Sequence, residues 1–586
     1  MVLTINELAP TVIEGVIRAV VDTYRAGGEL GGRSGWKQAL QLVAVCSKWR
    51  FLGTRIVYRH AYIESRARIL DDGSRALRFY TNLDLACKTG NVQRVRHLAM
   101  RLDDFVLDSE SVDYLVHRAI GFGSWDWSGV RSLEVRLYLG KGGNAEGSQR
   151  GHQGSLAKLF ACILAKGMPN VSRLSLAAYS NDGLAKIVGN TLVRQYAQQL
   201  THIESTYGID FPPSHCFSRL EHLKALLSTS VECALPKVVP ERLRHLELSN
   251  VTPATFSWSS FLGTYDGRAE ITFENLRFLE LDFSRIVHLS GGSRGYRRSN
   301  GNGNGNGSSG SGGAQRAGRA RRQASAEALL SLPAAHRYRV LFPRLRHIKT
   351  YGSAQNTDFL PTDVYPDSLS SLNVCGSPAS LSMWRDSPIR SIGSLNVLIF
   401  AAKRSEEDIF YSSTNYCFSS ARCQDAKVNR AEMTLFAMDF ALDAHRICWP
   451  NLTCLSTMFS IDYSTAVALV LQLPALVQLN SFMFNPANMP LGLATSIASP
   501  DAAESLKLAP LQTQLEFLCI YNNHAASEDR IESAALQLLL LQTRSLQSLV
   551  IHSPELYSAI VNFVDRFKPN YVHLAYIEVS VGSCIP

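Results

Sequence analysis

A leucine pattern, Leu-x-x-Leu-x-Leu, recurs along most of the chain and constrains its fold more than any other feature. The clearest copies are Leu243/Leu246/Leu248, Leu276/Leu279/Leu281, Leu369/Leu372/Val374, Leu515/Leu518/Ile520 and Leu546/Leu549/Ile551. Weaker copies begin at Val95, Val130, Val171, Leu200, Leu220, Leu345, Leu395, Leu452, Leu476 and Leu574. The interval between copies varies: it is 23 residues from Leu220 to Leu243 and 33 residues from Leu243 to Leu276. A repeated unit this short cannot bury its own apolar face, so neighbouring units must stack on one another.

The sequence before several copies predicts a helix that leads into a strand. Ser155 is a suitable N-cap for a helix ahead of the strand at Val171, and Ser553 is one ahead of the strand at Leu574. The apolar stripes of these two helices are Leu156, Leu159, Phe160, Ile163 and Leu164 in the first and Tyr557, Ile560, Val561, Val564 and Phe567 in the second. Alternating helices and short strands at this spacing are typical of leucine-rich repeats. We therefore expect an α/β solenoid, an irregular leucine-rich-repeat horseshoe with strands inside the bend and helices outside.

The residues between the leucines are candidates for binding. Side chains alternate along a strand, so the leucines should point into the stack and the intervening residues onto the concave surface. The intervening residues mix aromatic rings with both signs of charge, which fits protein recognition better than phosphate binding. The candidate substrate-binding residues are His245, Glu247, Phe278, Glu280, Asp282, His347, Lys349, Tyr351, Phe517, Tyr521 and His552. The alternative is that they are ordinary solvated strand residues.

Glycine-rich segments interrupt the repeats. The longest runs from Gly291 and includes alternating Asn and Gly from Asn300 to Gly307, so it cannot bury a core and should be a disordered insertion. A shorter loop is expected from Gly140 to Gly154. The expected organisation is a helical module at 1–65, a first repeat region at 66–290, the insertion at 291–326 and a second repeat region at 327–586. Whether the repeats form one continuous horseshoe or two hinged halves stays open.

The positive charge of the chain is concentrated in the insertion. The formal net charge is +9, and seven arginines with no Asp or Glu lie between Gly291 and Ala326, which leaves +2 for the remainder. A basic face spread over the folded part is therefore not expected, and nucleic acid is not an expected partner. One alternative is that the insertion, which includes Arg316 to Arg322, contacts RNA or directs nuclear import.

The N-terminal residues lack the leucine repeat and read as helices around a Gly-rich loop. Three segments carry a resemblance to a known module: Leu8-Ala9-Pro10-Thr11-Val12-Ile13, Leu42-Val43-Ala44-Val45-Cys46-Ser47-Lys48-Trp49-Arg50 and Ile56-Val57-Tyr58-Arg59-His60. They resemble the F-box, a small all-α module, and Val45 to Arg50 is the most specific stretch. The opening departs from the F-box pattern in its intervening Ala9 and in lacking an acidic residue after Pro10. With irregular leucine-rich repeats behind it, the whole chain is similar to fungal F-box/leucine-rich-repeat proteins.

This resemblance implies a function without chemistry. In that family the F-box docks on the Skp-type adaptor of a cullin-RING ubiquitin ligase, and the repeats hold a protein substrate. The resemblance implies adaptor contacts at Leu8, Pro10, Val12, Ile13, Val45, Cys46 and Trp49. The chain would then be the substrate receptor of an SCF-type ligase, with an unknown protein substrate. The alternative is a ubiquitin-independent scaffold whose N-terminal helices only cap the solenoid.

The sequence offers no catalytic, metal or cofactor motif in a fitting context. Gly305 to Gly310 spells Gly-x-Gly-x-x-Gly but lies inside the glycine alternation. The chain has 12 cysteines, none in a Cys-x-x-Cys pair, and the Arg-His pairs at His97, His245 and His347 are interpreted as a structural repeat feature. The uncharged stretch from Tyr463 to Pro500 is broken by prolines, so no membrane span is expected. The N-terminus does not resemble a secretory signal, and we expect a non-enzymatic, cytoplasmic or nuclear protein without a cofactor.

Overall fold

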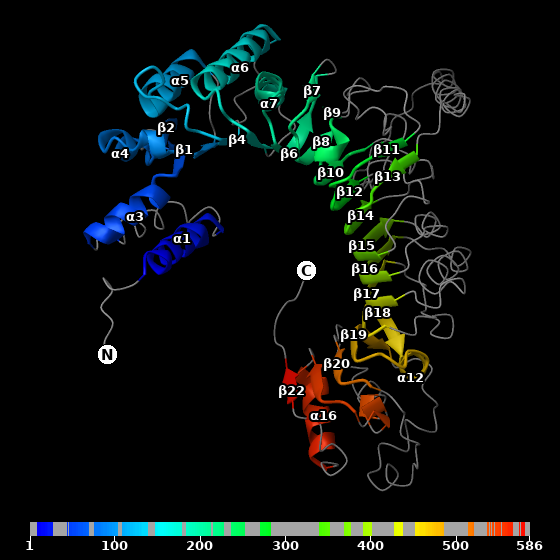
Figure 1. The fold of residues 1–586 in the computed structure, drawn as a ribbon. Helices are drawn as coiled ribbons and strands as arrows, with labels where there is room; N and C mark the ends of the chain where they lie inside the picture. Colours follow the sequence, from blue (N-terminus) through cyan, green and yellow to red (C-terminus); the bar gives the residue numbers. More distant parts are fainter. Residues whose placement is uncertain are drawn as a thin grey trace, which may run out of the picture. The chain divides into compact units, whose positions relative to one another are not determined.

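The computed structural model divides the chain into two compact units (Figure 1). Unit 1 comprises Met1–Ser249 and Ser259–Asp266, and unit 2 comprises Asn250–Trp258 and Gly267–Pro586. The residues that the structure describes are 9–26, 41, 44, 46–69, 75–103, 108–138, 147–178, 183–212, 215–227, 236–251, 270–282, 339–351, 368–376, 391–400, 427–436, 452–485, 514–520, 536–537, 539–540, 542–543, 545–551, 554–566, 574 and 576–579. The insertion at 291–326 lies outside them. The division between the units falls after Ser249, ahead of that insertion.

Unit 1 is built on a sheet of parallel strands that pair in chain order. Its strands are β1 (His60–Ile69), β2 (Arg75–Thr81), β3 (His97–Asp103), β4 (Ser132–Tyr138), β5 (Arg173–Ala178), β6 (His202–Ile209), β8 (His222–Leu227) and β10 (His245–Ser249). β2 is antiparallel to β1, whereas β1, β3, β4, β5, β6, β8 and β10 are all parallel. β7 (Cys216–Phe217) and β9 (Lys237–Val238) form a small separate pair.

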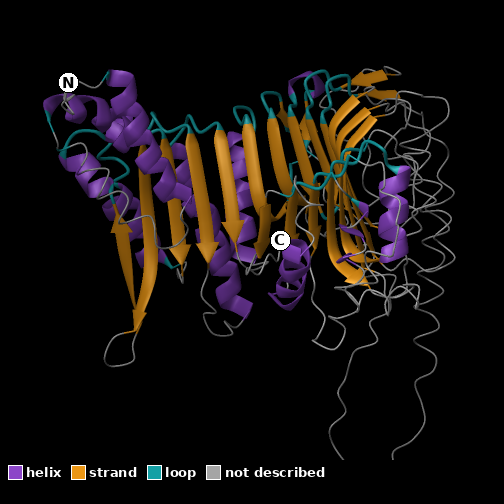
Figure 2. Ribbon diagram, turned by 90° about the horizontal axis from the view of Figure 1, so that it is seen from below, coloured by secondary structure: helices purple, strands orange, loops and turns teal. Residues whose placement is uncertain are grey.

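Two of the described helices of unit 1 precede its first strand, and the others lie between strands in the chain. The helices are α1 (Pro10–Ala26), α3 (Ser47–Val57), α4 (Leu83–Lys88), α5 (Ser109–Asp113), α6 (Gly147–Gly167), α7 (Gly183–Tyr196), the 3-10 turns η3 (Val92–Arg94) and η5 (Pro240–Arg242), and the π-helical segment η4 (Tyr114–Ile120). Figure 1 shows α5, α6 and α7 on one face of the sheet, and Figure 2 shows the strands side by side with helices behind them. None of the described helices combines the length and apolar composition that a membrane crossing needs.

The leucine pattern forms the core of unit 1. Strands β3 and β4 alternate half-buried and buried positions, as period-two side-chain alternation requires. Leu243, Leu246 and Leu248 of the clearest copy are all fully buried. The weaker copies that begin at Val95, Val130, Val171, Leu200 and Leu220 also place buried residues in register on successive strands. Burial of this apolar face, worth about 25 cal/mol per Å², is the main force that stacks the units of the repeat.

Helix α7 packs closely on β5 and β6. A Cβ added at Gly189 would lie 2.3 Å from the Tyr207 hydroxyl and 3.2 Å from Leu176, so only glycine fits this helix position. Tyr207 follows an irregularity in the pairing of β6 with β8, between Ser205 and Gly208, and its hydroxyl donates to the Ala185 carbonyl at 3.1 Å.

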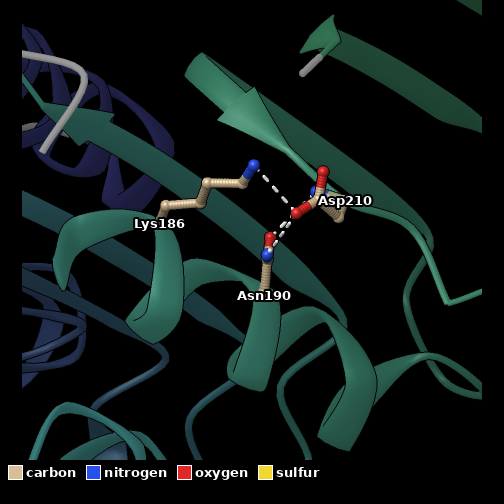
Figure 3. A network of polar contacts seen from close by, with 3 residues as sticks. All are labelled: Lys186, Asn190 and Asp210. Carbon is tan, nitrogen blue, oxygen red and sulfur yellow. Dashed lines mark hydrogen bonds and ion pairs between the residues drawn. The ribbon is translucent and has the colours of Figure 1, made fainter. Parts of the chain in front are cut away.

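A polar network links α7 to the residue that follows β6 (Figure 3). The Lys186 ammonium lies 2.9 Å from Oδ2 of Asp210, and the Asn190 amide donates to the same oxygen at 3.1 Å. The Asp210 backbone N–H returns a hydrogen bond to Asn190 Oδ1 at 2.9 Å. These contacts fix the chain where it leaves β6.

Unit 2 repeats the same parallel arrangement. Its main sheet consists of β12 (Phe278–Asp282), β14 (His347–Tyr351), β15 (Ser368–Gly376), β16 (Ser391–Phe400), β17 (Lys427–Phe436), β18 (Cys454–Asp462), β19 (Gln478–Asn485), β20 (Phe517–Ile520), β21 (Ser548–Ile551) and β22 (Tyr576–Val579). Each strand is parallel to the next in chain order. β11 (Glu270–Thr272) and β13 (Arg339–Leu341) form a second parallel pair. The expected α/β class, with a large parallel sheet, is confirmed.

Helices contribute less to the described part of unit 2. α12 (Tyr463–Gln472) follows β18 directly, and α16 (Pro554–Arg566) lies between β21 and β22 in the chain. The leucines at 276, 279, 281, 369, 372, 515, 518, 546 and 549 are all buried, as expected. In the stretch that could be mistaken for a membrane span, α12 ends at Gln472, two residues before Pro474, and the described residues that follow include β19.

The structure corrects three expectations about local elements. Ile392, not Leu395, begins the copy on β16, because Leu395 pairs with the central Leu372 of β15. The register of β17 makes Val428, which pairs with Ile392, the start of a further copy that the leucine search missed.

The third correction concerns the helix expected to begin at Ser155. α6 begins at Gly147, inside the expected Gly140–Gly154 loop, so Ser155 is not its N-cap. The buried stripe is also rotated: Leu159 is 52% exposed, whereas Ala157 and Ala161 are buried beside Phe160. Small alanines therefore lie on the buried face of α6, which the pattern of large apolar residues does not predict.

Candidate protein-binding surfaces

One face of the unit 1 sheet carries rows of side chains that the register brings together. The face that holds the leucines is packed under the helices, and the intervening positions occupy the other face. The first row of register partners runs His60, His97, Ser132, Arg173, His202, His222 and His245. The second row, two residues further along each strand, runs Tyr62, Ala99, Glu134, Ser175, Glu204, Lys224 and Glu247.

The histidines of the first row stack on one another. The ring centroids of His60 and His97 are 4.5 Å apart at an interplanar angle of 12°. The rings of His202 and His222 are 4.2 Å apart at 10°, and those of His222 and His245 are 5.8 Å apart at 24°. These distances follow from the register, because neighbouring strands lie about 4.8 Å apart.

Burial favours the neutral form of the stacked imidazoles on β6, β8 and β10. Burial is the main cause that lowers the pKa of His202 to about 4, and the nearby His222 and Arg173 lower it further. The pKa values of His222 and His245 are also lowered, again mainly by burial. Neutral imidazoles both donate and accept hydrogen bonds, so at pH 7 His202, His222 and His245 are neutral polar groups, and Arg173 carries the positive charge of this row.

The second row is organised by ion pairs. Lys224 Nζ lies 3.0 Å from Glu247 Oε1, and His245 Nε2 lies 3.7 Å from the other oxygen of Glu247. Glu134 contacts Arg136 of its own strand at 2.5 Å and Arg101 of β3 at 3.9 Å. Glu247 is therefore compensated by Lys224 of the same row, and Glu134 by two arginines two residues further along the strands, which makes this part of the surface polar with little net charge.

In unit 2 the corresponding positions combine aromatic and charged groups at the first two strands. The rings of Phe278 and His347 are 6.2 Å apart, and His347 Nδ1 is 3.2 Å from the Ser371 hydroxyl. Lys349 Nζ lies 3.3 Å from Glu280 Oε1 and 4.8 Å from the centroid of the Tyr351 ring. The ammonium thus bridges a carboxylate and an aromatic face.

The expected substrate-binding residues fall into three groups. Eight are half-buried at the intervening strand positions: His245, Glu247, Phe278, Asp282, His347, Lys349, Tyr351 and Phe517. Glu280 is only 8% exposed, so it holds Lys349 more than it offers a surface to a partner. Tyr521 and His552 lie outside the described residues.

The sequence analysis missed other members of the rows. His202, His222 and Arg173 stand two residues after the starts of weaker copies, the offset that His245 has from Leu243. The weaker copies therefore carried the signal, but of these only the copy at Leu345 contributed residues to the predicted binding set.

The expected adaptor-contact residues differ in how far their side chains are exposed. Helices α1 and α3 pack on each other, with Ile13, Ile17 and Trp49 in the core. Ile13 and Trp49 are thus structural, because their side chains are too buried to meet an adaptor. Pro10 is exposed and Cys46 is half-buried. Leu8 and Val45 lie outside the described residues.

The helical pair nevertheless exposes apolar groups. Val12 is 48% exposed and Val16 is 39% exposed, and at a spacing of four residues they share one face of α1. Phe51 of α3 is 62% exposed and was missed by the sequence analysis. The helical part ends at Val57, and the expected boundary at 65 falls within β1.

The comparisons with known proteins supply no family. A scan against protein-family models and a search of curated proteins both found no match to the chain. In the part of the chain that the structure describes, no group of three or more His, Cys, Asp or Glu side chains is arranged to hold a metal ion. The function therefore has to be argued from the surfaces themselves.

Proposed function

We propose that this protein is a non-catalytic substrate receptor of an SCF-type ubiquitin ligase. In this proposal α1 and α3 form an F-box-like module that docks on a Skp-type adaptor and through it on a cullin. The leucine-rich-repeat-like sheets then hold a protein substrate. Such a receptor accelerates modification by raising the local concentration of its target beside the ligase.

The observation that carries the proposal is the apolar surface of the N-terminal helices. Val12, Val16 and Phe51 are 39 to 62% exposed, so each forgoes part of the roughly 1.5 to 3 kcal/mol of transfer free energy that full burial of such a side chain contributes. Isolated exposed apolar residues are ordinary, but here they lie on two packed helices that also carry the F-box-like stretch ending at Arg50. An adaptor would cover them.

The parallel sheets support the substrate-binding half of the proposal. Strands that pair in chain order, with leucines on one face and polar rows on the other, are what a leucine-rich-repeat solenoid requires. The half-buried rows combine His, Glu, Lys and aromatic groups, a mixture suited to recognising a protein surface.

Adaptor capture tests the proposal. The intact chain, used as bait with purified Skp-type adaptor, should retain it, and a Val12→Asp/Phe51→Asp variant should lose at least about tenfold of the captured adaptor, because two desolvated anchors are removed. The matched control is Leu159→Asp, which places the same charge at an exposed apolar position of α6. Loss with the control as well, or no capture by the folded intact chain, would contradict the proposal.

The second candidate is a ubiquitin-independent scaffold. Its support is the burial of Ile13 and Trp49, which suits a helical cap that closes the edge of the sheet at β1 and β2. A scaffold would bind its protein partner equally well with or without the adaptor, and the Val12→Asp/Phe51→Asp variant would behave like the intact chain.

A further inference from the structure

Arginines gather where four neighbouring strands of unit 1 begin. At the residue just before or at the start of four successive strands stand Arg59, Arg96, Arg131 and Arg173, which we term the basic edge. Their backbones are linked directly: Arg96 N–H donates to Arg59 O at 2.9 Å, Arg131 N–H to Arg96 O at 2.8 Å, and Arg173 N–H to Arg131 O at 2.9 Å. Arg59, Arg96 and Arg131 thus follow one another from strand to strand, about 4.8 Å apart. Arg173 pairs with Ser132 and therefore lies one residue further along its strand.

The basic edge has no carboxylate partner among the described residues. The Arg96 guanidinium donates to the carbonyls of Gln93 and Val95, at 2.7 and 3.1 Å, and Arg131 donates to the Asn170 carbonyl at 3.3 Å. These bonds hold two guanidinium groups over the turns without neutralising them. The positive charges therefore remain available to a negative partner.

Further along the sheet, the arginine at the corresponding position has an acidic partner. Before β10 stands Arg244, whose Nε lies 3.6 Å from the Glu221 carboxylate on the neighbouring strand connection. The uncompensated charge thus ends after β5. Counting the whole chain gave only +2 outside the insertion and argued against a basic face, but a net charge averages over edges of opposite character.

An exposed aromatic residue lies in the segment that leads into β4. Trp125, six residues before Arg131, is 42% exposed, and an added Cβ at Gly121 would lie 2.8 Å from Cδ1 of its indole. Further along the same segment, Gly129 makes room for Arg96, because its added Cβ would clash with the guanidinium. Tryptophan and arginine are the side chains most enriched at the energetic centres of protein interfaces.

We propose that the basic edge binds an extended acidic peptide segment of a partner protein. Carboxylates along such a segment would pair with the guanidinium groups in turn, and Trp125 offers an apolar surface in the segment that precedes Arg131. Single-stranded nucleic acid fits less well, because it needs a series of aromatic faces for successive bases, and the segment before β4 offers a single exposed ring, that of Trp125. The nearest imidazole faces, those of His60 and His97, are stacked on each other. The inference rests on the proposed protein-binding function and names the chemistry of the partner.

A dye-labelled oligoglutamate peptide and the intact chain provide the test. Fluorescence anisotropy at low ionic strength should show binding that weakens as salt is added. An Arg131→Glu/Arg173→Glu variant should bind at least about tenfold more weakly, since two attractive charges become repulsive. The matched control, Arg118→Glu/Arg194→Glu, makes the same change of net charge at exposed arginines of η4 and α7 and should stay within about twofold of the intact chain.

Three results would overturn the inference. They are the absence of oligoglutamate binding by the intact chain, equal weakening in the control variant, and tighter binding of oligothymidylate at the same arginines. Circular dichroism checks the fold of both variants, and Arg131→Gln/Arg173→Gln replaces the charge-reversal variant if that one does not fold. Adaptor capture by the same samples is independent of this readout, so failure of the acidic-peptide inference and failure of the ligase proposal are distinguishable.

Discussion

Units 1 and 2 use one arrangement of strands with different outward side chains. The buried positions are nearly interchangeable, as Leu223 of β8 and Leu518 of β20 illustrate. The second outward row differs: the charged residues Glu134, Glu204, Lys224 and Glu247 recur through unit 1, whereas unit 2 begins with Glu280 and Lys349 and continues through Asn373, Asn396, Glu432, Ser456 and Asn480. The comparison shows that the leucine positions specify the sheet and leave the outward rows free to specify partners.

The largest effect should come from the shared leucine positions. Leu223→Ala in unit 1 and Leu518→Ala in unit 2 should each lower the free energy of unfolding by about 2 to 5 kcal/mol, because both remove a fully buried side chain and leave a cavity. Urea denaturation measures the loss. The control Lys224→Ala, at the exposed neighbouring position, should change stability by less than about 1 kcal/mol. Equal losses at 223 and 224 would contradict the assignment of faces.

A smaller effect should distinguish the helix-backed region of unit 1. Gly189→Ala should destabilise the protein by about 1 to 3 kcal/mol, because the new methyl group meets the Tyr207 hydroxyl and Leu176. Thermal unfolding followed by circular dichroism is the measurement. Gly183→Ala on the same helix has nothing within 4 Å of the added Cβ and should be neutral or slightly stabilising. A destabilisation shared by both variants would refute the close packing of α7 on β6.

The smallest effect concerns the histidine row of unit 1. Because the pKa of His202 is about 4 in the folded protein and near 6.5 when unfolded, the unfolded state binds more protons between these values. Stability should therefore fall as pH drops from about 6.5 to 4, and His202→Gln should remove about 1 kcal/mol of that fall, a figure reduced for the half-exposed ring. Chemical denaturation across this pH range measures it. An unchanged pH dependence in the variant would contradict the neutral stack.

The sequence alone predicted the features that follow from the regular alternation of side chains along a strand. The buried triplets and the identities of outward residues such as His245 and Lys349 follow from strand alternation. What it missed depends on contacts between distant segments. Leu159 is exposed because the buried face of α6, which packs on α7, includes Ala157 and Ala161 in its place, and Trp49 is buried where α3 packs on α1.

The sequence alone did not reveal the basic edge, for a related reason. Arg59, Arg96, Arg131 and Arg173 are far apart in the chain and become neighbours only through the strand register. A net charge cannot reveal such a cluster, because compensating acidic residues elsewhere in the chain enter the same sum.

Hydrogen exchange of the intact chain, with and without purified Skp-type adaptor, tests the central proposal most directly. The proposal predicts slower exchange of backbone amides in Pro10–Ala26 and Ser47–Val57 when the adaptor is present, with the amides of β3 to β10 unchanged. Unchanged exchange in α1 and α3 at saturating adaptor, or protection confined to the sheet, would contradict it.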